Sequence, residues 1–103
     1  MSTKTIRLQT NATRDYILLS EVFDWFEPEI IGGTNASEPA IRKAYVIYGD
    51  LETVEDFLLV DKKIFQQRKG RFVSRFLDDH ALQPGDLIKI ERLAPYTYRF
   101  MPG

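Results

Sequence analysis

Apolar and polar residues alternate along much of this chain, with the period of two that is typical of half-buried β-strands. Ile6 and Leu8 share one face of a strand predicted over residues 4–10, and Tyr98 and Phe100 share one face of a strand near the C-terminus. Shorter apolar runs predict further strands at residues 16–19, 44–48, 57–60, 64–65 and 87–90. The pattern therefore predicts six or seven strands.

Two segments show helical rather than alternating spacing. Phe72, Val73, Phe76 and Leu77 fall on one face of a helix, which the Pro-Gly-Asp turn at residues 84–86 follows. The other helix is predicted to begin at Ser20 as its N-cap and to end at Pro28. Residues 32–39 are polar and rich in turn formers, which predicts a loop, and residues 52–55 are predicted to form a turn.

Length and composition indicate one globular domain over residues 1–103. The chain has 44% apolar residues and no cysteine, so we expect one core with neither a disulfide nor a thiolate metal site. Many short strands with two short helices predict a mainly β, α+β domain, built as a closed or partly open barrel. The N-terminus lacks the apolar run of a signal peptide, so we expect a cytoplasmic protein without a membrane partner.

The most unusual charge pattern is a basic segment at residues 62–75. It holds six Lys and Arg residues and no Asp or Glu, although the net charge of the chain is only −1. Arg and Gln side chains pair with base edges, and Lys and Arg neutralise phosphates, so the segment predicts nucleic-acid contact. A solvated turn before a helix is the alternative. The candidate contacts are Lys62, Lys63, Gln66, Gln67, Arg68, Lys69 and Arg71.

The C-terminal third resembles the closing half of a B3-like DNA-binding domain. The resemblance rests on the helix aromatics, the Gly-Asp pair at 85–86, the strand after it, Arg92 and the final aromatic strand. The plant members carry several tryptophans, whereas this chain has only Trp25. It therefore resembles more closely the recognition domains of bacterial type II restriction endonucleases, of the EcoRII and BfiI kind.

This resemblance implies a seven-stranded open pseudobarrel with two short helices, which grips the major groove of double-stranded DNA with two arms. The N-terminal arm would be residues 9–15, and the second arm would be residues 62–71. The resemblance also implies a non-catalytic chain without a cofactor, with a nuclease domain further along the same polypeptide. Candidate contacts on the N-terminal arm are Gln9, Asn11, Thr13, Arg14 and Asp15.

Two other classes of function compete with this interpretation. Asp61 and Lys63 form a D-x-K triplet, and with Asp50 they would suit a Mg²⁺-dependent nuclease. The second alternative is a small-barrel protein-interaction module, because Gly-Asp before an alternating strand occurs in many barrels.

Overall fold

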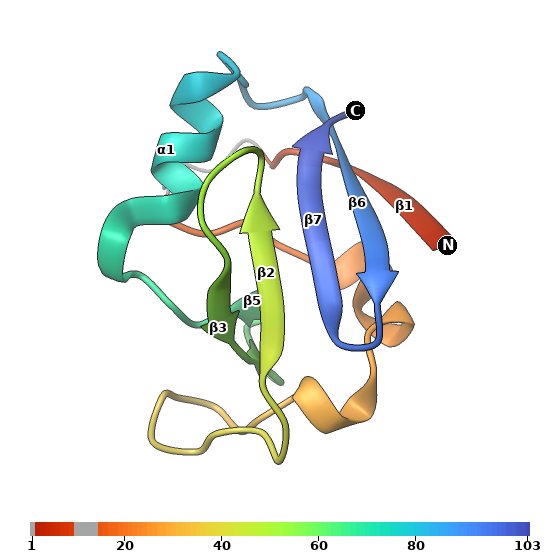
Figure 1. Cartoon of the computed structure of the whole chain (residues 1–103), viewed down its shortest axis with the longest axis vertical. Helices are drawn as coiled ribbons and strands as arrows, with labels where there is room; N and C mark the ends of the chain where they lie inside the picture. The colour runs from red at the N-terminus through yellow and green to blue at the C-terminus, as the bar shows by residue number, and fades with distance from the viewer. Residues whose placement is uncertain (1, 10–14) are drawn as a thin grey trace.

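The centre of the molecule is a five-stranded mixed sheet (Figure 1). The computed structural model describes residues 2–9 and 15–103. Among the strand pairs that this sheet forms in the described residues, β2–β7 alone is parallel. In the described part of the chain the strand order is linear, so the sheet is not closed into a barrel. In spatial order its strands are β1 (Ser2–Arg7), β6 (Leu87–Ala94), β7 (Thr97–Pro102), β2 (Ala44–Tyr48) and β3 (Val54–Asp56).

The remaining elements are short. Strands β4 (Leu58–Leu59) and β5 (Ile64–Phe65) form a separate antiparallel ladder. The single α-helix of the described residues, α1 (Phe72–Asp79), packs beside β2. Three 3-10 helices complete the set: η1 (Ser20–Trp25), η2 (Pro28–Ile30) and η3 (Lys69–Arg71). The result is a small α+β domain made mostly of strands.

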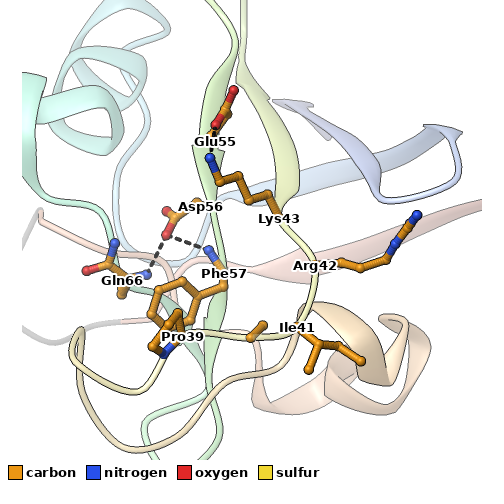
Figure 2. A pocket seen from close by; sticks show the side chains of 9 residues that line it. Pro39, Ile41, Arg42, Lys43, Glu55, Asp56, Phe57 and Gln66 are labelled. Carbon is orange, nitrogen blue, oxygen red and sulfur yellow. Dashed lines mark hydrogen bonds and ion pairs between the residues drawn. The ribbon is translucent and has the colours of Figure 1, made fainter.

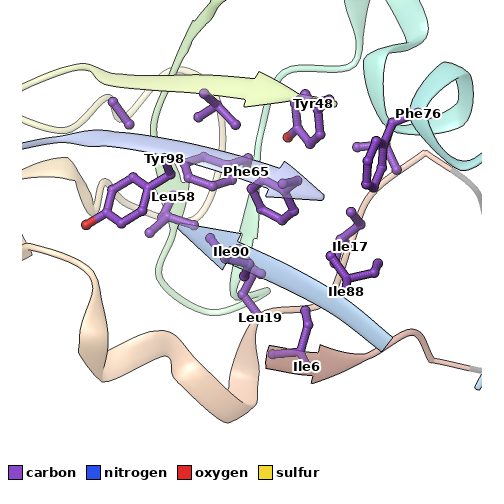
Figure 3. Close-up of a cluster of buried hydrophobic side chains, with 14 of the residues drawn as sticks. Ile6, Ile17, Leu19, Tyr48, Leu58, Phe65, Phe76, Ile88, Ile90 and Tyr98 are labelled. Atoms are coloured by element: carbon purple, nitrogen blue, oxygen red, sulfur yellow. The ribbon is translucent and has the colours of Figure 1, made fainter. Parts of the chain in front are cut away.

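The hydrophobic core lies between the sheet and the segments that cover one of its faces (Figure 3). Alternation in β7 buries Tyr98 and Phe100 completely, as the sequence pattern predicts. The Phe65 ring from β5 packs edge-on against both Phe26, which follows η1, and Phe100. Within the described residues no strand pairing joins the β4–β5 ladder to the main sheet, and the Phe65–Phe100 contact links the two.

Three predictions of local structure were wrong. Residues 16–19 do not form a strand: the Leu19 amide donates to the Lys63 carbonyl (2.9 Å), and the Leu19 carbonyl accepts the Val22 amide at the start of η1 (3.1 Å). The first helix is 3-10, and Leu19, not Ser20, is its N-cap, without a side-chain hydrogen bond. It ends at Trp25, and Pro28, which was predicted to end it, begins η2. The predicted turn at 52–55 overlaps β3, because Val54 is buried and pairs with Val46.

Candidate nucleic-acid interface

The structure brings the second arm against the chain that directly follows the N-terminal arm. The Arg68 guanidinium lies over the Tyr16 ring, 5.3 Å from its centroid. Around this contact is a hollow of about 400 Å³, which we call the Tyr16–Arg68 hollow; it is lined by Tyr16, Leu18, Lys62, Ile64 and Arg68. Residues that are about fifty positions apart in the sequence therefore share one concave surface.

Most cations on this surface are free to meet a ligand. Lys62, Arg68, Lys69 and Arg71 are exposed, and none of them forms an ion pair within residues 2–9 and 15–103. Arg71 donates one long hydrogen bond, 3.5 Å, to the Ser74 hydroxyl. Because no carboxylate of the described residues forms an ion pair with these side chains, they create a local positive field on a chain of near-neutral charge.

Two other cations of the basic segment serve internal contacts. The Lys63 ammonium donates to the Val60 carbonyl (3.1 Å) and lies 4.8 Å from the centre of the Phe23 ring. Arg75 donates to the Gly70 carbonyl (3.3 Å) and lies 3.6 Å from a Glu52 carboxylate oxygen. Of the predicted contacts, Lys63 is therefore the cation that is most engaged with the fold.

The backbone of the basic segment is held by Asp56, a buried carboxylate at the end of β3. It accepts hydrogen bonds from the amides of Phe57 (2.7 Å), Gln66 (3.2 Å) and Gln67 (3.1 Å). Burial raises the pKa of Asp56 to about 6, although these bonds favour the ionised form. Sequence reasoning missed Asp56, because Gln66 and Gln67 are ten and eleven residues away and no local pattern marks them as its partners.

Backbone conformation shapes the end of the second arm. Gly70 has φ of +80°, and a Cβ atom there would lie 2.5 Å from the Phe72 ring. Arg71 follows in the left-handed region with φ of +51°, directly before α1. Glycine is therefore required at position 70 by the turn itself, whether or not a phosphate approaches it.

The other predicted contact residues fall into three groups. Gln66 and Gln67 are half-buried, and the Gln67 side chain accepts a long bond from the Lys69 amide (3.4 Å). Gln9 is half-buried and Asp15 is exposed. The remaining three, Asn11, Thr13 and Arg14, lie outside the described residues.

A second pocket, of about 450 Å³, lies between residues 39–43 and β3 (Figure 2). Its charged groups are already paired: Lys43 bonds Glu55 at 2.8 Å, and Asp56 accepts the backbone amides described above. Arg42 lies over the Tyr96 ring, 4.8 Å from its centroid. This pocket therefore offers a charged ligand fewer free partners than the Tyr16–Arg68 hollow does.

The residues of the nuclease alternative do not gather in one site. Asp50 follows β2 and pairs with Arg99 (3.0 Å), whereas Asp61 lies in the β4–β5 turn and accepts the Lys62 amide (2.9 Å). The Lys63 ammonium is bonded to the Val60 carbonyl. Among the described residues, no group of three His, Cys, Asp or Glu side chains is arranged to hold a metal ion.

Comparison with known proteins gives no further assignment. No protein-family model matches the chain, and neither curated proteins nor solved structures show significant similarity to it. In the part of the chain that the structure describes, no helix has the length and apolar character needed to cross a bilayer.

Proposed function

We propose that this domain binds double-stranded DNA sequence-specifically, through the major groove, with the surface around the Tyr16–Arg68 hollow. The observation that carries the proposal is the contact between Tyr16 and Arg68, which joins residues 62–71 to the chain directly after residues 9–15. The finer fold that we propose is the B3-like open pseudobarrel, in which two such arms enter one groove.

The charge distribution supports a specific reader rather than a general DNA-coating protein. Phosphate attraction supplies most non-specific affinity, and the net charge of −1 keeps that attraction small away from the basic surface. Arg68 offers a guanidinium fork that suits the O6 and N7 atoms of guanine. The Tyr16 ring supports that fork, so less side-chain freedom is lost on binding.

In this proposal the chain itself is non-catalytic and needs no cofactor. On the resemblance alone, we propose that it supplies target recognition to a bacterial type II restriction endonuclease. A nuclease domain in the same polypeptide would then perform the cleavage.

Selection from a randomised duplex library tests the binding proposal. It is performed in EDTA at two salt concentrations and followed by sequencing of the bound fraction. We expect one short enriched motif, and we expect Arg68→Ala to weaken binding to that motif about tenfold or more.

Lys4→Ala is the matched control for that variant. Lys4 is an exposed cation of β1 and does not line the Tyr16–Arg68 hollow. In Figure 1, β1 and α1 lie on opposite sides of the view. We expect the removal of the Lys4 side chain to leave the motif and the affinity nearly unchanged. Binding that enriches no motif, or that both variants weaken equally, would contradict a specific interface at this surface.

A further inference from the structure

The floor of the Tyr16–Arg68 hollow is aliphatic, although its rim is basic. Leu18 is half-buried and contributes to the lining, and Ile64 is almost completely buried at 1% exposure. Lys62 and Arg68 stand beside them. A surface that only neutralised phosphates would need the cations but not this apolar floor.

We propose that this hollow reads the C5-methyl group of a pyrimidine that neighbours a guanine bound by Arg68. The inference rests on the proposed function. In the major groove, thymine differs from cytosine in part by its C5-methyl group, which apolar side chains contact favourably. 5-Methylcytosine presents the same methyl group, so the two bases share the recognised chemistry.

The arrangement of Tyr16, Leu18 and Arg68 suits a DNA site in which a guanine edge lies beside the methyl group of a pyrimidine. Arg68 and Leu18 line the same hollow, so in this proposal they would contact neighbouring base pairs. Bidentate bonding of Arg68 to guanine would fix the register, and Leu18 would then contact the adjacent pyrimidine.

A base flipped out of the duplex is a weaker candidate for the same space. A flipped base is held by stacking between aromatic or apolar side chains and by hydrogen bonds to its Watson–Crick edge. The Arg68 guanidinium already covers the Tyr16 ring, at 5.3 Å from its centroid. No other aromatic side chain lines the hollow among the described residues.

The test uses duplexes of the selected motif that differ by one methyl group. At each pyrimidine in turn, thymine is replaced by uracil, or cytosine by 5-methylcytosine. We expect one position, next to a guanine, at which the methyl group strengthens binding about three- to tenfold, as burial of one methyl group predicts. The thymine–uracil and methylcytosine–cytosine pairs show which base supplies the methyl group.

Leu18→Ala then locates the effect on the protein. We expect this variant to lose the methyl preference, so that it binds the methylated and unmethylated duplexes with nearly equal affinity. The matched control is Leu93→Ala, which shortens an exposed leucine of β6 outside the hollow and should keep the preference.

The comparison of duplexes with the unaltered chain needs no variant to fold, so it decides the inference by itself. Equal affinity for methylated and unmethylated duplexes at every position would overturn the methyl reading and leave the proposed DNA binding intact. Failure to enrich or bind any duplex would overturn both.

Discussion

Asp56 links the fold to the candidate interface through one carboxylate. Its oxygens accept the amides of Gln66 and Gln67, where the chain leaves β5 and enters the basic part of the second arm. Desolvation of an ionised, buried carboxylate destabilises the folded state. Charge-assisted hydrogen bonds from several backbone amides offset part of that cost. Asp56 therefore fixes the backbone from which Arg68 and Lys69 project.

Asp56 should make the stability of the domain depend on pH in an unusual direction. Burial raises its pKa from 3.8 to about 6, so between these values the unfolded chain has lost a proton that the folded chain still holds. The contribution of Asp56 to the free energy of unfolding is complete below pH 4, and it falls by about 3 kcal/mol as the pH rises to 6 and above.

Urea denaturation of the original chain and of Asp56→Asn at pH 4, 5, 6 and 7 measures this effect. The difference in unfolding free energy between the two proteins isolates residue 56, because the other carboxylates titrate in both. We expect that difference to shift against the original chain as the pH rises. A difference that stays constant, or shifts in its favour, would show that the pKa of Asp56 is not raised.

Residue partners of this kind could not be predicted from the sequence. Arg92 lies 4.7 Å from the centre of the Trp25 ring and donates to the Tyr98 hydroxyl at 3.1 Å. The Tyr98 hydroxyl in turn donates to Glu27, 71 residues away. Periodicity identifies which residues are buried, but it holds no information on which distant side chains satisfy one another.

At the scale of elements, α1 ends in a Schellman motif with an alanine where glycine is usual. The Leu82 amide bonds the Leu77 carbonyl (2.9 Å), and the Ala81 amide bonds the Asp78 carbonyl (3.2 Å). Ala81 adopts φ of +50°, a left-handed conformation that costs an L-residue about 1–2 kcal/mol. The Schellman motif therefore requires a strained backbone conformation at Ala81.

Ala81→Gly should relieve that strain. Ala81 is exposed, so little packing is lost, and we expect the free energy of unfolding to rise by about 0.5–1 kcal/mol after the greater freedom of unfolded glycine is subtracted. Thermal unfolding should show a midpoint about 2–8 °C higher.

The opposite change, Gly85→Ala, is the control. Gly85 has φ of +96° and open space around it, so Gly85→Ala should destabilise the domain through backbone strain alone. A lower midpoint for Ala81→Gly would contradict this account.

Elements with a clean period were the ones that the sequence predicted well. Strands β6 and β7 have one face in the core, and their alternation matches the burial of Ile88, Ile90, Tyr98 and Phe100. The short β3 was missed because three residues are too few to establish a period. Residues 16–19 were predicted as a strand because their apolar run indicates burial, and an irregular segment can bury Ile17 and Leu19 equally well.

At the scale of the whole molecule, the total charge is nearly balanced, but the charges are unevenly distributed over the surface. The chain has 14 Lys and Arg against 15 Asp and Glu, yet the second arm has exposed cations without a carboxylate partner among the described residues. The sequence predicted this surface because charges that are adjacent along the chain stay adjacent in any fold. It could not predict that Tyr16 would lie beneath Arg68, because that contact depends on the tertiary path of both segments.

Salt dependence of binding should separate a phosphate contact from a base contact on this surface. Lys69 is exposed, and its ammonium has no partner within the described residues, so we expect it to bind a phosphate and to release a counterion on association. Lys69→Ala should reduce the slope of log affinity against log salt concentration by about 1 and weaken all duplexes alike.

Arg68→Ala should instead weaken the selected motif more than an unrelated duplex, because it removes a contact to a base edge. Titrations of both duplexes at four salt concentrations measure both quantities, with Lys4→Ala as the control. An unchanged slope for Lys69→Ala would place its ammonium away from the DNA backbone.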